Sequence, residues 1–95
     1  MLDAVELARK ELGDAYRVKV TTAHLEIQDD ADLERFAKLG VIANYTPWWH
    51  CGGNNVAALL GEERAKKMYR CKTPWDSGAL VTWSSDNVAY GDFMT

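Results

Sequence analysis

The chain has 95 residues, of which 47% are hydrophobic and 26% are charged, so it can form one small globular domain with a modest core. Its formal net charge of −3 argues against a nucleic-acid partner, which would require a basic surface. No apolar run approaches the roughly 20 residues of a membrane-spanning helix, and the first residues enter a charged helical pattern rather than a secretion signal. We therefore expect a cytoplasmic protein with no membrane partner.

The first half of the chain alternates between helical and strand patterns. Residues 2–12 have apolar side chains at helical spacing, which predicts a helix. Residues 16–25 contain an alternating, β-branched run that predicts a strand, and residues 29–39 predict the next helix. The apolar run 41–46, which ends before a proline, predicts a short buried strand.

The second half repeats this alternation. Residues 54–78 predict a second helical crossover, which Gly61 interrupts, and residues 79–84 predict a third strand. Helices between successive strands favour parallel pairing with right-handed crossovers. The sequence thus predicts the α/β class, with three parallel strands in chain order and crossover helices, in one domain over residues 1–95. Residues 87–95 show no period and are expected to fray.

Two residues at predicted strand ends are candidate site residues. His24 follows the first strand, where a neutral imidazole can bind a metal ion or polarise a carbonyl, although a core histidine with an ordinary hydrogen bond is an equal alternative. Asp86 follows the third strand, where a carboxylate can bind a metal and accept a proton from water, although an Asp that caps a turn is common.

Other polar residues give weaker indications. Glu26 could orient the His24 ring or be a solvated loop residue. A zinc site of His24, His50, Cys51 and Cys71 fits no compact zinc-binding spacing, and two cysteines are too few for a disulfide framework. Trp48 and Trp49 are expected to pack or to line a substrate cleft.

Three collinear segments carry a resemblance to a known family. The run Arg35-Phe36-Ala37-Lys38-Leu39-Gly40-Val41-Ile42-Ala43, within Ala23–Asn44, resembles the R-F-A-x-L-G-V-I-A segment of the family-3 amidohydrolases. The similarity resumes at Leu60–Ala65, and again at Asp76–Ala79 with Ser84–Asp86. These segments occur in the family's order and together span nearly the whole chain.

The resemblance implies a fold and a chemistry. It implies a partial (β/α)8 barrel, strands six to eight, of a metal-dependent hydrolase that cleaves C–N bonds of small molecules by metal-activated water. It also implies that His24 is a metal ligand and that Asp86 is both a metal ligand and the general base. The implied cofactor is a divalent metal, with zinc expected.

The chain also departs from the family pattern. The first-strand His-x-His pair and the strand-five histidine are absent, and Ala23 stands where the family has Glu. A whole barrel takes about 250 residues. We therefore expect a fragment that is inactive alone, binds metal weakly or not at all, and forms a homo-oligomer through open sheet edges. The alternatives are a non-catalytic, self-associating α/β module and a small redox or zinc protein that uses Cys51 and Cys71.

Overall fold

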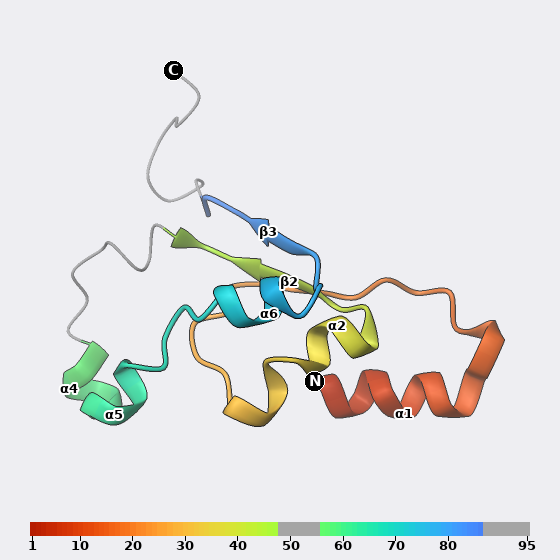
Figure 1. Cartoon of the computed structure of the whole chain (residues 1–95), viewed down its shortest axis with the longest axis horizontal. Coiled ribbons are helices and arrows are strands. Elements are labelled where there is room, and N and C mark those ends of the chain that lie inside the picture. The colour runs from red at the N-terminus through yellow and green to blue at the C-terminus, as the bar shows by residue number, and fades with distance from the viewer. Residues whose placement is uncertain (48–55, 87–95) are drawn as a thin grey trace, which may run out of the picture.

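A computed structural model of the chain describes residues 1–47 and 56–86. The described chain forms a small sheet with short helices beside it (Figure 1). The elements, in chain order, are α1 (Leu2–Leu12), a 3-10 turn (Gly13–Ala15), β1 (Thr21–Thr22), a second 3-10 turn (Asp30–Asp32), α2 (Arg35–Leu39), β2 (Ile42–Tyr45), α4 (Val56–Leu60), α5 (Glu62–Ala65), α6 (Lys72–Asp76) and β3 (Val81–Trp83).

The described strands form one parallel sheet in the order β1-β2-β3. Thr22 of β1 is level with Ala43 of β2, which is level with Val81 of β3. This arrangement confirms the predicted α/β class, the parallel pairing and the strand order. It also means that all three strands end at the same edge of the sheet, as parallel pairing requires.

The first strand is much shorter than the predicted 16–25. Only Thr21–Thr22 has strand geometry, although hydrogen bonds from Ile42 N–H to Val20 O (2.9 Å) and from Leu25 N–H to Asn44 O (3.1 Å) flank it. A strand persists only where a neighbour supplies hydrogen bonds, and β2 has four residues. Val18, before that pairing begins, is 63% exposed.

The predicted helix 29–39 is divided into two parts. A 3-10 turn over Asp30–Asp32 precedes α2, and the Asp32 N–H donates to Asp29 O at 3.0 Å. Gly40 ends α2 as predicted, with φ of 58° and its N–H directed at the carbonyls of the last turn. Glycine reaches this left-handed geometry without steric cost, which lets the chain turn directly into β2.

The core lies between one face of the sheet and helices α1 and α2. Phe36 is 2% exposed, and Ala43 and Tyr45 are 0% and 1% exposed. Arg35 holds the two helices together, because its guanidinium pairs with Asp3 at 2.6 Å and Glu6 at 2.8 Å. The clustered residues are Leu2, Val5, Phe36, Leu39, Val41, Ala43, Tyr45, Ala79 and Val81.

A second set of contacts joins the segment after β1 to the segment before α6. The Gln28 side-chain amide donates to the Tyr45 hydroxyl at 2.8 Å. Arg70 donates to the Gln28 carbonyl and pairs with Asp30, which also accepts from Lys67 at 2.8 Å. These cations hold the pKa of the Asp30 carboxyl below its ordinary value. Within the described ranges, no helix is long and apolar enough to cross a membrane.

Candidate active site

The two faces of β2 carry different residues because side chains alternate along a strand. Ala43 and Tyr45 are buried in the apolar core, whereas Ile42 and Asn44 are half-buried on the opposite face. Thr46, which follows the strand, continues the polar positions and is 1% exposed. The polar face of the sheet therefore meets the common C-terminal edge of the three strands at Asn44 and Thr46.

His24 lies at this edge, two residues beyond β1. Its backbone has a φ of 53°, and its side chain is exposed. The ring contacts the chain through Nδ1, which is 2.8 Å from the Thr46 hydroxyl oxygen. This hydrogen bond fixes the orientation of the ring and leaves Nε2 without a hydrogen-bond partner among residues 1–47 and 56–86.

The same threonine connects His24 to the third strand. The Thr46 hydroxyl oxygen lies 3.0 Å from the Ser84 hydroxyl oxygen. Ser84 Oγ donates to the Asn44 side-chain carbonyl at 2.9 Å, and the Asn44 side-chain N–H donates to Thr82 Oγ1 at 3.0 Å. The ends of β1, β2 and β3 are thus joined by one continuous series of side-chain hydrogen bonds.

Asp86 follows this series, two residues beyond Ser84. It is half-buried, and its φ is 51°. Since β2 separates β1 from β3, two strand spacings of ~4.8 Å place the strand ends that precede His24 and Asp86 about 10 Å apart. Both residues therefore follow parallel strands at one sheet edge.

The backbone at both residues is unfavourable for ordinary side chains. His24 and Asp86 are two of the three described non-glycine residues with positive φ. This conformation costs about 1–2 kcal/mol for an L-residue, although Asp and His tolerate it better than most. Such strain is concentrated at functional sites, where the direction of a side chain matters more than stability.

The other candidate residues lie elsewhere. Glu26 is exposed and makes no ion pair with His24 in the described part of the chain; its backbone carbonyl accepts from Tyr69 N–H at 2.8 Å. The residue that orients the ring is therefore Thr46, not Glu26. Cys71 is a half-buried free thiol that packs against the core. Trp48, Trp49, His50 and Cys51 fall outside the described residues.

The donor atoms at the sheet edge suit a metal ion only in part. One imidazole and one carboxylate are donors that zinc accepts, but zinc sites use three or four protein or water ligands. Within residues 1–47 and 56–86, no group of three or more His, Cys, Asp or Glu side chains could hold a metal. The described residues thus offer one imidazole and one carboxylate at this edge, which are fewer donors than a zinc site uses.

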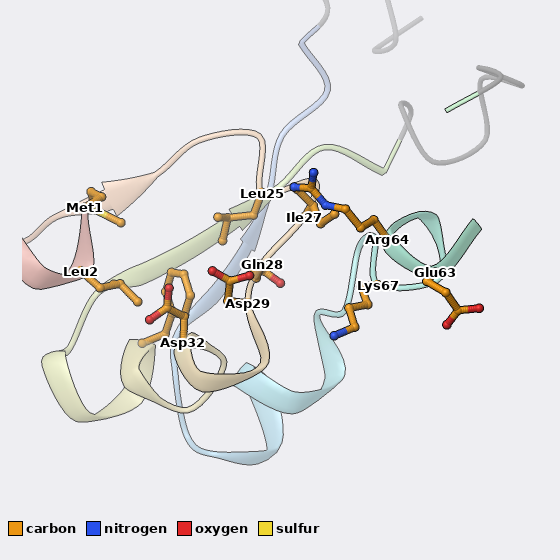
Figure 2. Close-up of a pocket in the computed structure, with 11 residues that line it drawn as sticks. Met1, Leu2, Leu25, Ile27, Gln28, Asp29, Asp32, Glu63, Arg64 and Lys67 are labelled. Atoms are coloured by element: carbon orange, nitrogen blue, oxygen red, sulfur yellow. The ribbon is translucent and has the colours of Figure 1, made fainter. Parts of the chain in front are cut away.

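One cavity among the described residues is separate from this edge. A space of about 460 Å³ lies between the start of α1, the segment after β1 and α5. Figure 2 shows Met1 and Leu2 on one side of it and Arg64 and Lys67 on the other. Neither His24 nor Asp86 lines it; Gln28 does, and its side-chain oxygen is buried with no hydrogen-bond partner among residues 1–47 and 56–86. The cavity is lined by apolar groups together with charged groups of both signs.

Comparison with known proteins assigns the fold to a family. The sequence profile of the amidohydrolase family matches residues 1–94, and the chain belongs to that family. It is also similar to the crystal structure of an uncharacterized metal-dependent hydrolase from Pyrococcus furiosus, with a TM-score of 0.66 and 29% identity. The similarity covers 92% of this chain but 18% of the Pyrococcus chain, so the present chain spans less than a fifth of that protein. No curated protein matches.

The polar residues between the two predicted ligands were not identified from the sequence. Asn44 and Thr46 are two residues apart, as are Thr82 and Ser84, so each pair lies on one face of its strand. In strands that are otherwise apolar, this spacing was an available signal. The spacing does not predict the pairing register, which brings Asn44 level with Thr82.

Proposed function

We propose that this chain contributes the strand-six to strand-eight part of an amidohydrolase active site, which hydrolyses C–N bonds of a small-molecule substrate with metal-activated water. The observation that carries the proposal is the hydrogen-bond series from His24 through Thr46 to Ser84. It links His24 at the end of β1 to Ser84 beyond β3, two residues before Asp86. This arrangement at the C-terminal edge of a parallel sheet is where barrel enzymes have their active sites.

Two residues have distinct roles in this proposal. His24 presents Nε2 as a metal ligand, because Nδ1 is occupied by Thr46. The Asp86 carboxylate is a second ligand and accepts the proton of the attacking water. A divalent ion, which we propose is zinc, supplies the activated water when it is bound.

The chain alone should not catalyse the reaction. A complete barrel has about 250 residues, and its remaining strands would supply the other ligands and the substrate cleft. Two donors hold an ion weakly, so little activated water would form at neutral pH. The cytoplasmic location stays a prediction from the sequence.

Zinc titration of the isotope-labelled chain, followed by NMR, tests the ligand roles. We expect the His24 imidazole signals to shift at millimolar zinc, and His24→Ala to abolish the response of the sheet edge. His50→Ala is the matched control, since these are the two histidines of the chain, and it should leave that response intact. A zinc response at His50 with none at His24 would contradict the metal role of His24.

An activity assay tests the claim that the chain is incomplete. Simple amides and N-acyl amino acids, with zinc added, should show no turnover above the rate of a denatured sample. Turnover that Asp86→Asn abolishes would show that the chain contains a full active site, and would contradict the fragment hypothesis.

A non-catalytic, self-associating module is the second candidate. Its support is exposed apolar surface at the last strand, where Leu80, just before β3, is 60% exposed and Trp83 of β3 is 57% exposed. The edge positions of β1 and β3 add to this support. We propose a homo-oligomer in which these edges pair. Sedimentation should then show a mass above the 10.7 kDa of one chain, with Leu80→Lys favouring the monomer. A folded monomer at high concentration would contradict self-association and leave the hydrolase proposal unaffected.

A further inference from the structure

The hydrogen-bond series at the sheet edge has a direction, because each hydroxyl group has one proton to donate. The side-chain carbonyl of Asn44 has none, so Ser84 must donate in their 2.9 Å hydrogen bond. Ser84 therefore accepts from Thr46 across 3.0 Å. The Thr46 proton is then used, and Thr46 can only accept from the His24 ring at 2.8 Å. The proton of the neutral ring must be on Nδ1.

The remaining contact of Asn44 agrees with this direction. The Asn44 side-chain N–H donates to Thr82 Oγ1 at 3.0 Å, which places its carbonyl oxygen toward Ser84. Thr46 is 1% exposed, and Asn44 and Ser84 are half-buried. Water therefore has little access to Thr46, which accepts the hydrogen bond from the His24 ring. The direction of the hydrogen-bond series is set by protein groups.

We propose that Thr46, Ser84 and Asn44 are positioning residues that hold His24 in the Nδ1–H tautomer and so reserve the Nε2 lone pair for a divalent cation. This inference rests on the proposed function for the identity of the ligand, but the tautomer is a property of the metal-free chain. The neutral histidine side chain in water favours the opposite tautomer, with its proton on Nε2. The series therefore has a measurable consequence in the absence of any metal.

Nitrogen-15 NMR of the metal-free chain measures the tautomer directly. The His50→Ala background leaves His24 as the single histidine, which assigns its ring signals. The measurement is made at about pH 8.5, where an ordinary imidazole with a pKa of ~6.5 is neutral. We expect the Nδ1 shift of a protonated nitrogen and the Nε2 shift of an unprotonated one. A ring with its proton mainly on Nε2 would overturn the proposal.

Two substitutions separate positioning from packing. Thr46→Val preserves the shape of the buried residue but removes the acceptor, so the Nε2–H tautomer should become the major form. Ser84→Ala, at a less buried position, removes the acceptor of the Thr46 proton and should move the tautomer the same way if Thr46→Val fails to fold. A tautomer that neither folded variant changes would contradict the proposal.

Asn44→Asp is the conservative control. Both of its oxygens accept hydrogen bonds, so Ser84 still donates and the Nδ1–H tautomer should persist. If the Asn44 amide instead donated to Ser84, this variant would reverse the series and change the ring tautomer. A change of tautomer in Asn44→Asp would therefore also overturn the direction that we assign.

Zinc affinity then tests the consequence for metal binding. Loss of a residue that orients a ligand typically costs about 10–100-fold in metal affinity, which is the loss that we expect for Thr46→Val. An Nδ1–H tautomer in a chain where zinc acts on His50 but not on His24 would support the positioning series and contradict the metal role. Zinc binding at a ring with its proton on Nε2 would support the metal role and contradict the positioning series.

Discussion

The side chains on the two faces of β2 make different kinds of contact. On the core face, Ala43 and Tyr45 pack against apolar residues of the helices, and the Tyr45 hydroxyl bonds to Gln28. On the opposite face, Asn44 and Thr46 contact other polar side chains at the strand ends. One strand of four residues therefore separates stability from candidate chemistry by simple alternation.

This comparison shows how one short strand can serve both an apolar core and a polar sheet edge. The core face packs against helices α1 and α2 and beside residues of β3, all of which belong to the same chain. The polar face depends on hydrogen bonds across three adjacent strands, which also belong to it. Substitutions on the core face should therefore lower stability and leave the His24 tautomer and the zinc response unchanged. Substitutions on the polar face should change the tautomer and the zinc response and have a smaller effect on stability.

The largest effect is expected on the core face. Phe36 is 2% exposed and belongs to the central cluster, so Phe36→Ala should lower the free energy of unfolding by about 3–5 kcal/mol. Native domains have about 5–15 kcal/mol in total, so much of the chain would be unfolded at 37 °C. Urea denaturation followed by circular dichroism measures this change.

Leu59→Ala is the matched control for this substitution. Leu59 is 87% exposed, so its truncation should change stability by less than about 0.5 kcal/mol. Equal losses at the two positions would show that the cluster around Phe36 is not the stabilising core.

A medium effect is expected from Tyr45→Phe. It removes the hydroxyl that accepts from Gln28 at 2.8 Å and donates to the Arg70 carbonyl at 3.4 Å. Gln28 is buried, and its side-chain oxygen already has no partner in the described part of the chain, so the loss should be about 1–3 kcal/mol. Tyr16→Phe, which keeps the ring beneath Arg9, is the control and should be nearly neutral.

The same variant has a pH signature. Burial raises the pKa of the Tyr45 phenol above its ordinary value, so the unfolded chain releases this proton more readily than the folded chain. The corresponding stability is complete below about pH 10 and is lost as the pH rises toward the folded pKa. Stability should therefore fall less steeply above pH 10 in Tyr45→Phe than in the original chain. Burial also raises the pKa of Tyr69, so part of the slope should remain.

The sequence predicted the parts of the fold that depend on local pattern. The boundaries of α1 and its amphipathic spacing are local, and Leu2–Leu12 agrees with the prediction. The order of the strands follows from the alternation with helices. Strand β1 was overestimated because its length depends on a partner in another part of the chain, not on its own β-branched residues.

The candidate site was predictable in its end points but not in its connections. His24 and Asp86 were identified by their places after apolar strands and by the family resemblance. The Thr46 and Ser84 contacts depend on the register between β2 and β3, which a single sequence does not encode locally. Positive φ at His24 and Asp86 was also unpredictable, because neither residue is a glycine.

The smallest effect should have the opposite sign and lie at the site. Asp86 has a φ of 51°, so Asp86→Gly should relieve backbone strain. The gain is limited by the greater freedom of glycine in the unfolded chain and by the tolerance of Asp for this geometry, and we expect about 0.5–1 kcal/mol of added stability. Denaturant midpoints of the two chains measure it.

Two controls connect this gain to strain rather than to loss of charge. Asp86→Ala also removes the carboxylate but keeps a Cβ, so it should be no more stable than the original chain. Asp29→Gly places glycine where φ is −69° and should lower stability by about 0.4–1 kcal/mol. If Asp86→Gly is more stable and also loses the zinc response of the sheet edge, the Asp86 carboxylate takes part in zinc binding and lowers the stability of the fold. If Asp86→Ala is stabilised equally, the cost is electrostatic and the backbone explanation is wrong.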